Sequence, residues 1–150
     1  LQGRREESMK LLQDSLEQIG RLSERIGVDV SLEIMEKIPK EFVTDAQSMK
    51  EAAGSRKNQF FYTLDIAHCD SEEEPFHILD QLKRISKIHI SNRKGGCYHT
   101  PLGNGDFSFK EMLPKLLAYG LPLVTEGYDD SRDFHRFMEN TVFLKTNGGL

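Results

Sequence analysis

Four apolar, strand-like runs in this sequence each deliver a metal-capable side chain near their end. These side chains are Glu33, Asp65, His89 and Glu126. An acid inside an apolar strand is costly to bury unless it is paired with a cation or bound to a metal ion. Any one acid could form a salt bridge with lysine or arginine, but three acids and a histidine at matching places favour one shared site. Carboxylates and imidazole together suit Mn²⁺, Mg²⁺, Zn²⁺ or Co²⁺, and oxygen-rich sites favour the harder ions.

His89 lies between Ile88 and Ile90, so the alternation of a strand places its side chain on the opposite face from both. A lone histidine there is more often a hydrogen-bonded core group. In the company of three acids we predict that it is a metal ligand.

Further polar residues cluster in the segments that follow two of these strands. His68 follows Asp65 by three residues, and Arg93, Lys94 and His99 follow His89. We predict that His68, Arg93 and His99 bind substrate, with Arg93 suited to a phosphate or a sugar hydroxyl. The alternative is that these are loop histidines and solvated charges.

The glycine-rich turn at residues 103–105 could present backbone N–H groups to an anion, or could be a turn and nothing more. Cys69 and Cys97 are expected to pack or to remain idle, because the sequence has no CxxC pairing of the kind found in structural zinc sites. His77 and His135 fall inside helical patterns, and we assign them no role.

Hydrophobic periodicity predicts which elements must position these side chains. Apolar residues at three- and four-residue steps predict helices, and short β-branched runs predict strands. The expected helices cover residues 6–26, 46–53 (capped by Thr44 or Asp45 and ended by Gly54), 71–84, 108–118 and 130 or 131 to 144. The expected strands cover residues 28–35, 60–66, 85–91 and 121–126, and residues 94–106 are expected to form a long loop.

The order is one helix and then four strand–helix units, which predicts parallel strands joined by right-handed crossovers in a single α/β domain over residues 1–150. Two layouts fit: an open doubly wound sheet, or about half of a (β/α)₈ barrel, since four strands cannot close a barrel alone. In both, functional groups gather at the carboxyl ends of the strands, where the four candidate ligands fall.

Composition narrows the class of protein. The formal charge of −4 argues against a dedicated nucleic-acid binder, without excluding an enzyme that acts on DNA. Two cysteines do not make a disulfide framework, so we expect a reducing compartment, the cytoplasm. The sequence has neither an apolar run long enough for a membrane span nor a signal peptide. It starts with Leu1, so we expect that something upstream has been removed or is not included.

Four stretches resemble the xylose isomerase-like TIM barrels, a superfamily of sugar phosphate isomerases and epimerases that also holds the endonuclease IV group (AP endonuclease family 2). They are residues 64–68 (LDIAH), 88–91 (IHIS), 99–107 (HTPLGNGDF) and 124–126 (VTE). The resemblance covers residues 6–144 as the last four strand–helix units of the barrel. The HxxLGxG stretch is specific to the superfamily but not to a substrate.

For the epimerases of this superfamily, the resemblance implies one divalent ion held by Glu33, Asp65, His89 and Glu126. It implies that His68 meets the substrate. It also implies that Glu33 and Glu126 flank a substrate carbon and move a proton between its faces. That chemistry is sensible, because an ion on the carbonyl and hydroxyl oxygens stabilises an enediolate while two carboxylates serve as base and acid.

For the three-zinc endonuclease branch, the resemblance implies that His68, His99 and an aspartate two positions before His99 are also ligands. Cys97 stands at that last position here, and Asn92 stands where an aspartate often follows the strand histidine. Both departures weaken the nuclease hypothesis without abolishing it, since cysteine can bind zinc.

Three hypotheses follow from these residues. The first is a divalent-metal-dependent isomerase or epimerase of a sugar or sugar phosphate, represented by its C-terminal half. The second is a metal-dependent endonuclease for abasic DNA, and the third is a barrel fragment that binds a ligand without turnover. Because the first half of the barrel is absent, either a missing N-terminal half or a second copy in a homodimer must complete it; a lone half would expose two strand edges.

Overall fold

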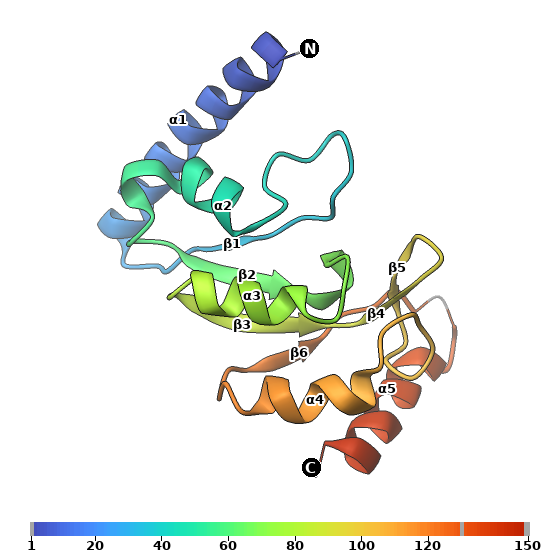
Figure 1. Ribbon diagram of the computed structural model, residues 1–150. Coiled ribbons are helices and arrows are strands. Elements are labelled where there is room, and N and C mark those ends of the chain that lie inside the picture. Colours follow the sequence, from blue (N-terminus) through green and yellow to red (C-terminus); the bar gives the residue numbers. More distant parts are fainter. Residues whose placement is uncertain (1, 130, 149–150) are drawn as a thin grey trace.

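The computed structural model describes residues 2–129 and 131–148, with the side chains of residues 2 and 3 left aside. Its centre is a parallel sheet of four strands, ordered β1-β2-β3-β6 (Figure 1). The strands are β1 (Ser31–Glu33), β2 (Phe61–Asp65), β3 (Ile85–Ile90) and β6 (Leu123–Thr125). Each spatial neighbour is also the next sheet strand along the chain, as successive βα units require. The predicted parallel α/β architecture is confirmed.

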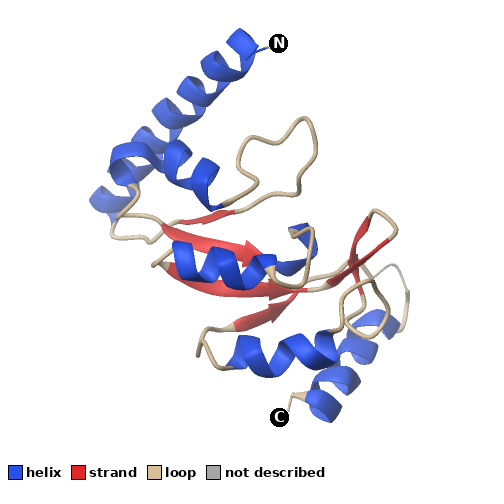
Figure 2. Ribbon diagram, in the orientation of Figure 1, coloured by secondary structure: helices blue, strands red, loops and turns tan. Residues whose placement is uncertain are grey.

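Five α-helices alternate with these strands in the described residues (Figure 2). They are α1 (Gln2–Ile26), α2 (Ala46–Ala53), α3 (Glu74–Gln81), α4 (Phe109–Leu117) and α5 (His135–Asn147), with short 3₁₀ turns at Gly54–Arg56 and Ile66–His68. Of the two predicted caps for α2, Asp45 is the one used. Its carboxylate accepts the Ser48 N–H at 2.7 Å, while the Ser48 hydroxyl accepts the Asp45 N–H at 3.1 Å.

The long loop expected over residues 94–106 is the main correction. An antiparallel hairpin forms here from β4 (Asn92–Lys94) and β5 (Cys97–Thr100), and β5 lies within the segment that was expected to be a loop. Gly95 and Gly96 turn the chain with φ angles of 53° and 84°, values that favour glycine and suit a tight hairpin turn. The hairpin carries His99 back over the strand ends, where its ring lies beside that of His68, with the ring centroids 5.3 Å apart.

Several element boundaries also differ from expectation, and α1 begins at Gln2, earlier than the expected residue 6. The first strand is shorter than residues 28–35, because β1 lies at the edge of the sheet and pairs only with β2 among the described residues. Helix α3 is shorter than residues 71–84. Helix α5 begins at His135, because Asp129 accepts the Ser131 and Phe137 N–H groups and holds the preceding segment outside the helix. Asp130, one of the two predicted start points, lies outside the described residues.

The core lies between the sheet and its helices. Leu64, Ile88 and Ile90 are fully buried, and they join Phe60 and Phe109 in one apolar cluster. The alternate strand positions carry Ser31, Thr63, Asp65 and His89 instead, and the Ser31 and Thr63 hydroxyls are hydrogen-bonded at 2.8 Å. One face of the sheet is therefore an apolar core face, and the other is a polar face that ends in the candidate ligands.

Candidate metal centre and active site

The sheet register brings the four predicted ligands together. Glu33 ends β1, Asp65 ends β2 and pairs with His89 of β3, and Glu126 directly follows β6. The Glu126 N–H donates to the Ile90 carbonyl, which continues the β3–β6 ladder to that residue. One donor atom from each of the four side chains lies within 4.8 Å of the others. Parallel strands end at one edge of a sheet, so four strand ends place four side chains around one point.

The donor atoms lack the partners that buried polar groups usually have. His89 Nδ1 contacts a Glu126 carboxylate oxygen and lies 3.5 Å from Glu33 Oε1 and 4.0 Å from Asp65 Oδ2. Yet Asp65 Oδ2, His89 Nδ1 and Glu126 Oε2 make no hydrogen bond within the described part of the chain. Native proteins rarely leave such atoms unsatisfied. Three carboxylates and one imidazole with unused lone pairs fit a divalent cation.

The surroundings of Asp65 perturb the pKa of its carboxyl group strongly. The residue is fully buried, and its Oδ1 atom accepts the Ala67 N–H at 2.8 Å, which turns Oδ2 toward the other ligands. Burial raises the pKa of Asp65 to about 7, His99 and the Ala67 N–H lower this pKa, and the charges of Glu126 and Glu33 raise it further. A cation at this point would supply the missing compensation for the buried negative charge.

His68 sits on the 3₁₀ turn behind Asp65. Its Nδ1 atom lies 2.8 Å from the Ile34 carbonyl, which acts as the acceptor, so Nε2 is turned toward Glu36 and Asp65 at 3.7 and 3.9 Å. This arrangement leaves one nitrogen of a buried imidazole facing two carboxylates at the edge of the metal site.

His99 approaches the same aspartate from the hairpin. Its Nδ1 atom is 3.8 Å from Asp65 Oδ2 and 3.0 Å from the Ser91 hydroxyl. Its φ of 60° is uncommon for a residue other than glycine, and such conformations occur often at functional sites. Donor atoms of Asp65, His68 and His99 form a second group within 4.8 Å, so Asp65 is common to both groups.

Arg93 does not join either group of donors. Its guanidinium donates to the Cys69 carbonyl at 2.5 Å and to Asp70 Oδ1 at 3.3 Å, and lies over the Tyr98 ring with 5.3 Å between the Arg93 Cζ atom and the ring centroid. Lys94 Nζ donates to Asn104 Oδ1 at 2.8 Å. Both side chains hold loops at the strand ends, and substrate binding by Arg93 stays a prediction.

Two residues that sequence reasoning missed lie beside the site. Glu36 faces His68 Nε2, and the Tyr98 ring stands edge-on to the His68 ring at 5.9 Å between centroids. Neither belongs to a strand end or a recognisable motif, and it is the path of the loop and the hairpin that brings each into place. Of the two free cysteines, Cys69 is buried and Cys97 is exposed, and the lack of a role for either stays a prediction.

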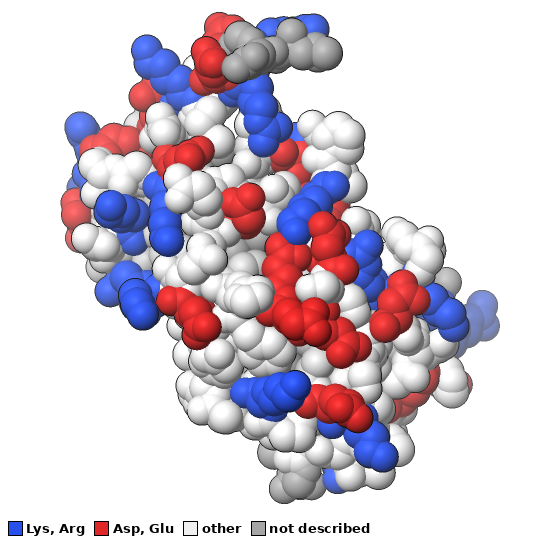
Figure 3. Space-filling view, viewed as in Figure 1, with Lys and Arg blue, Asp and Glu red and all other residues white. Residues whose placement is uncertain are grey.

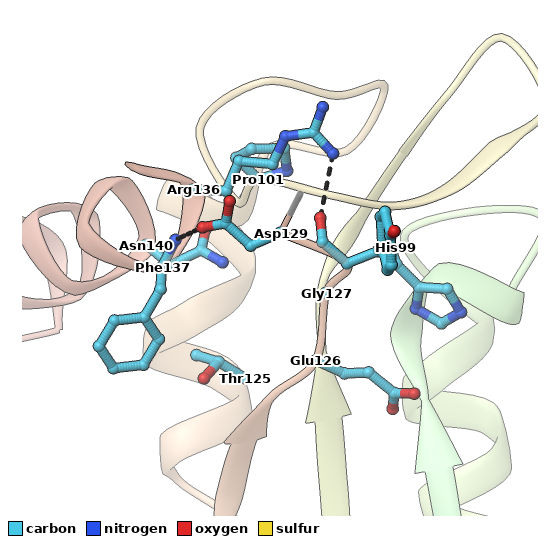
Figure 4. Close-up of a pocket in the computed structure, with 10 residues that line it drawn as sticks. His99, Pro101, Thr125, Glu126, Gly127, Asp129, Arg136, Phe137 and Asn140 are labelled. Carbon is cyan, nitrogen blue, oxygen red and sulfur yellow. Dashed lines mark hydrogen bonds between the residues drawn. The ribbon is translucent and has the colours of Figure 1, made fainter. Parts of the chain in front are cut away.

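A small cavity of about 70 Å³ opens beside Glu126 and His99 (Figure 4). Its wall continues through Asp129 and Arg136, where Arg136 donates to the Tyr128 carbonyl at 3.0 Å. Asn140 lines the cavity from α5 and accepts the Leu102 N–H at 2.8 Å. The segment after β6 and the start of α5 therefore form one wall of the space next to the candidate metal centre.

The fold and the site define a parallel α/β protein whose strand ends carry a candidate metal centre. A family model described as xylose isomerase-like TIM barrel matches residues 1–142, so the chain belongs to that family. No curated protein matches the chain. Within the described residues, none of the helices combines the length and apolarity that a membrane crossing requires.

Two solved structures share the fold. A D-tagatose 3-epimerase-like protein matches with a TM-score of 0.74 and 21% identity, over 92% of this chain and 55% of its own. The 3-keto-D-glucoside 4-epimerase YcjR from E. coli, in its apo form, matches with a TM-score of 0.69 and 18% identity, over 95% of this chain and 55% of its own. The chain thus spans about half the length of these structures and forms about half of a TIM barrel.

Proposed function

We propose that this chain carries the metal-binding half of a divalent-metal-dependent isomerase or epimerase that acts on a sugar or sugar phosphate. The convergence of Glu33, Asp65, His89 and Glu126 within 4.8 Å carries the proposal. One matched structure is named as a 3-keto-D-glucoside 4-epimerase and the other as a D-tagatose 3-epimerase-like protein. Both names refer to a sugar, which supports a sugar as the substrate. We further propose that the chain corresponds to the C-terminal half of the barrel and functions in the cytoplasm, where its two free cysteines would stay reduced.

In this proposal each side chain has a separate task. The four ligands would hold Mn²⁺, Mg²⁺, Co²⁺ or Zn²⁺, which would draw electron density from the carbonyl and hydroxyl oxygens of the substrate. Glu33 and Glu126 lie at the two ends of the sheet order, on β1 and after β6, so they can reach a substrate carbon from opposite sides. One carboxylate would remove the proton from that carbon and the other would return it, by way of an enediolate.

His68 and His99 are placed to orient the substrate. Both rings lie on the hairpin side of Asp65 and present nitrogen atoms toward the space around the ligand cluster. We propose that they bind substrate hydroxyls, while Arg93 would meet a more distant hydroxyl or phosphate.

The first test is metal binding by the chain as it stands. Titration calorimetry with Mn²⁺ is expected to give about one ion per chain, and Glu126→Gln is expected to weaken binding at least tenfold. Glu111→Gln on the exposed side of α4 is the matched control and is expected to bind like wild type. Equal affinity of all three proteins would overturn the ligand set.

The second test is deuterium exchange from D₂O into D-tagatose with Mn²⁺ present. Exchange in wild type and its loss in Glu126→Gln, with circular dichroism unchanged, is the expected result. Metal binding without exchange on any sugar would instead support the hypothesis of a non-catalytic barrel fragment.

A metal-dependent endonuclease for abasic DNA remains the second candidate because of the group formed by Asp65, His68 and His99. Two observations oppose it. The Asn92 Nδ2 group donates hydrogen bonds to the Leu102 and Phe107 carbonyls, and Cys97 is exposed. Figure 3 also shows acidic side chains gathered over the middle of one face, with basic ones around them. About three zinc ions per chain and cleavage of a duplex with an abasic site would favour this candidate.

A further inference from the structure

Basic side chains from three separate segments line one hollow at the starts of the sheet strands. A cavity of about 320 Å³ lies between the end of α2, the turn before β2 and the segment that joins α3 to β3. Its described lining includes no acid and four cationic residues, namely Lys50, Lys57, Lys83 and Arg84. In Figure 1 the starts of β2 and β3 lie at the opposite end of these strands from the hairpin, so the hollow is remote from the candidate metal centre.

The three lysines have no partner for their charge. Among the described residues, the ammonium groups of Lys50, Lys57 and Lys83 form neither a hydrogen bond nor an ion pair. By contrast, Lys37 in the segment after β1 forms an ion pair with Asp70 at 3.0 Å. Positive charges gathered around one hollow repel one another, and an anion placed between them would remove that cost.

Arg84 is held in place before any ligand binds. Its Nε atom donates to the Phe60 carbonyl at 3.1 Å, and its Nη2 atom donates to the Gln59 carbonyl at 3.4 Å. Its Cζ atom lies over the Phe61 ring, 4.3 Å from the ring centroid. Its Nη1 group makes no hydrogen bond within the described part of the chain. An ordered guanidinium loses little side-chain entropy when it binds a phosphate, so Arg84 is suited to that task.

The floor of the hollow fixes two of its cationic residues relative to each other. Tyr62 and Leu82 line the hollow and are both buried. The Tyr62 hydroxyl donates to the Lys57 carbonyl at 2.7 Å, and the Tyr62 N–H donates to the Arg84 carbonyl at 2.9 Å. One buried residue therefore sets the backbone positions of Lys57 and Arg84, which lie on different segments.

We propose that this hollow binds an oligophosphate, either an inorganic one or the diphosphate or triphosphate group of a nucleotide. A single phosphate group carries a charge of about −1.5 to −2 at pH 7, which would offset only about half of the positive charge around the hollow. The volume lies at the lower end of the range of about 300–1,000 Å³ that is usual for small-molecule sites, and leaves room for more than one phosphate group. Asn58 and Gln81 line the same hollow and can donate amide hydrogen bonds to phosphate oxygens.

Helix dipoles do not account for the whole cluster. Lys50 lies in the last turn of α2 and Lys83 follows the end of α3, where cations are favourable. Lys57 belongs to neither helix, and Arg84 donates to carbonyls of the segment before β2 instead of those of α3. The dipoles thus explain two of the cations but not the convergence of four. Because the hollow lies away from the metal centre, the proposal holds whichever reaction that centre performs.

The test uses sodium tripolyphosphate as the probe and the metal-free chain. Titration calorimetry is expected to give one saturable site per chain. The amide signals of Lys57, Tyr62 and Arg84 should shift in ¹H–¹⁵N correlation spectra, while those of Asp65 and Glu126 should not. An affinity for ATP close to that for tripolyphosphate would assign the site to the phosphate chain alone, and ATP binding at least tenfold more tightly would assign it to a nucleotide.

Two pairs of substitutions separate this site from general attraction to charge. Lys57→Gln with Lys83→Gln is expected to weaken tripolyphosphate binding at least tenfold. Lys110→Gln with Lys145→Gln makes the same change in net charge at exposed positions outside the hollow and is expected to bind like wild type. Equal weakening in both pairs would overturn the proposal, as would the absence of saturable binding by wild type or amide shifts confined to the metal-centre end of the sheet.

Discussion

Replacing Asp65 by asparagine should remove a pH-dependent penalty from the metal-free protein. The Asp65 side chain is fully buried, and burial raises its pKa from 3.8 to about 7. Because the folded state favours the neutral acid, the contribution of Asp65 to stability is complete below pH 3.8 and is lost as the pH rises toward 7. Asparagine keeps the shape and the acceptor for the Ala67 N–H but carries no charge.

The size of the effect follows from the pKa difference. About three pH units between 3.8 and 7 correspond to roughly 4 kcal/mol lost by pH 8. Part of this loss has already occurred at pH 5, so the change between pH 5 and pH 8 is roughly 3 kcal/mol. Such a change is large beside the total stability of about 5–15 kcal/mol that is usual for a domain.

Urea unfolding of EDTA-dialysed protein at pH 5 and pH 8 measures the effect. Wild type is expected to lose more stability than Asp65→Asn across this interval, and Asp80→Asn on the exposed side of α3 is the matched control. Saturating Mn²⁺ is expected to raise the free energy of unfolding of wild type at pH 8, by about 2.7 kcal/mol at a hundredfold excess over the dissociation constant. The same addition should leave the free energy of unfolding of Asp65→Asn little changed. Parallel losses in wild type and Asp65→Asn would refute the reasoning.

Three further substitutions probe the loops and the core. Asn92→Ala removes buried hydrogen bonds to the Leu102 and Phe107 backbones, so the free energy of unfolding in urea should fall by about 2 kcal/mol or more. Gly105→Ala would place a Cβ atom 2.1 Å from Asn92 Cγ, and we expect a loss of about 1–3 kcal/mol together with faster proteolysis of residues 101–107. Leu64→Ala opens a cavity in the core beneath the helices and should lower the free energy of unfolding by about 2–5 kcal/mol, which is measured as a lower melting temperature.

The positions of the four candidate ligands could be predicted because two simple rules act on the same residues. Alternating helix and strand patterns imply parallel strands, and parallel strands place their carboxyl ends at one edge. Glu33, Asp65, His89 and Glu126 therefore converge as soon as the strand order is known, and that order follows the chain. Their roles as ligands and catalysts stay predictions.

Loop geometry was less predictable because it depends on contacts between distant residues. The Gly95–Gly96 pair is a usable hairpin signal between residues 92–94 and 97–100, whereas the many turn residues of this segment predict a loop. The late start of α5 had no such signal, since it depends on Asp129 holding backbone N–H groups from outside the helix. Glu36 comes close to His68 because the segment after β1 contacts the His68 ring, whose Nδ1 atom lies 2.8 Å from the Ile34 carbonyl.

Asn92 shows how one atom can separate two functional hypotheses. Its Nδ2 atom donates to the carbonyls of Leu102 and Phe107 at 2.9 Å each, and its Oδ1 atom accepts the N–H groups of Arg93 and Phe107. An ionised aspartate has no donor and would set its lone pairs against both carbonyls. The asparagine therefore closes the glycine-rich loop around itself, and Gly105 has no Cβ because Asn92 occupies that space. A side chain committed in this way is unavailable to a metal ion, which favours the four-ligand site over a larger zinc cluster.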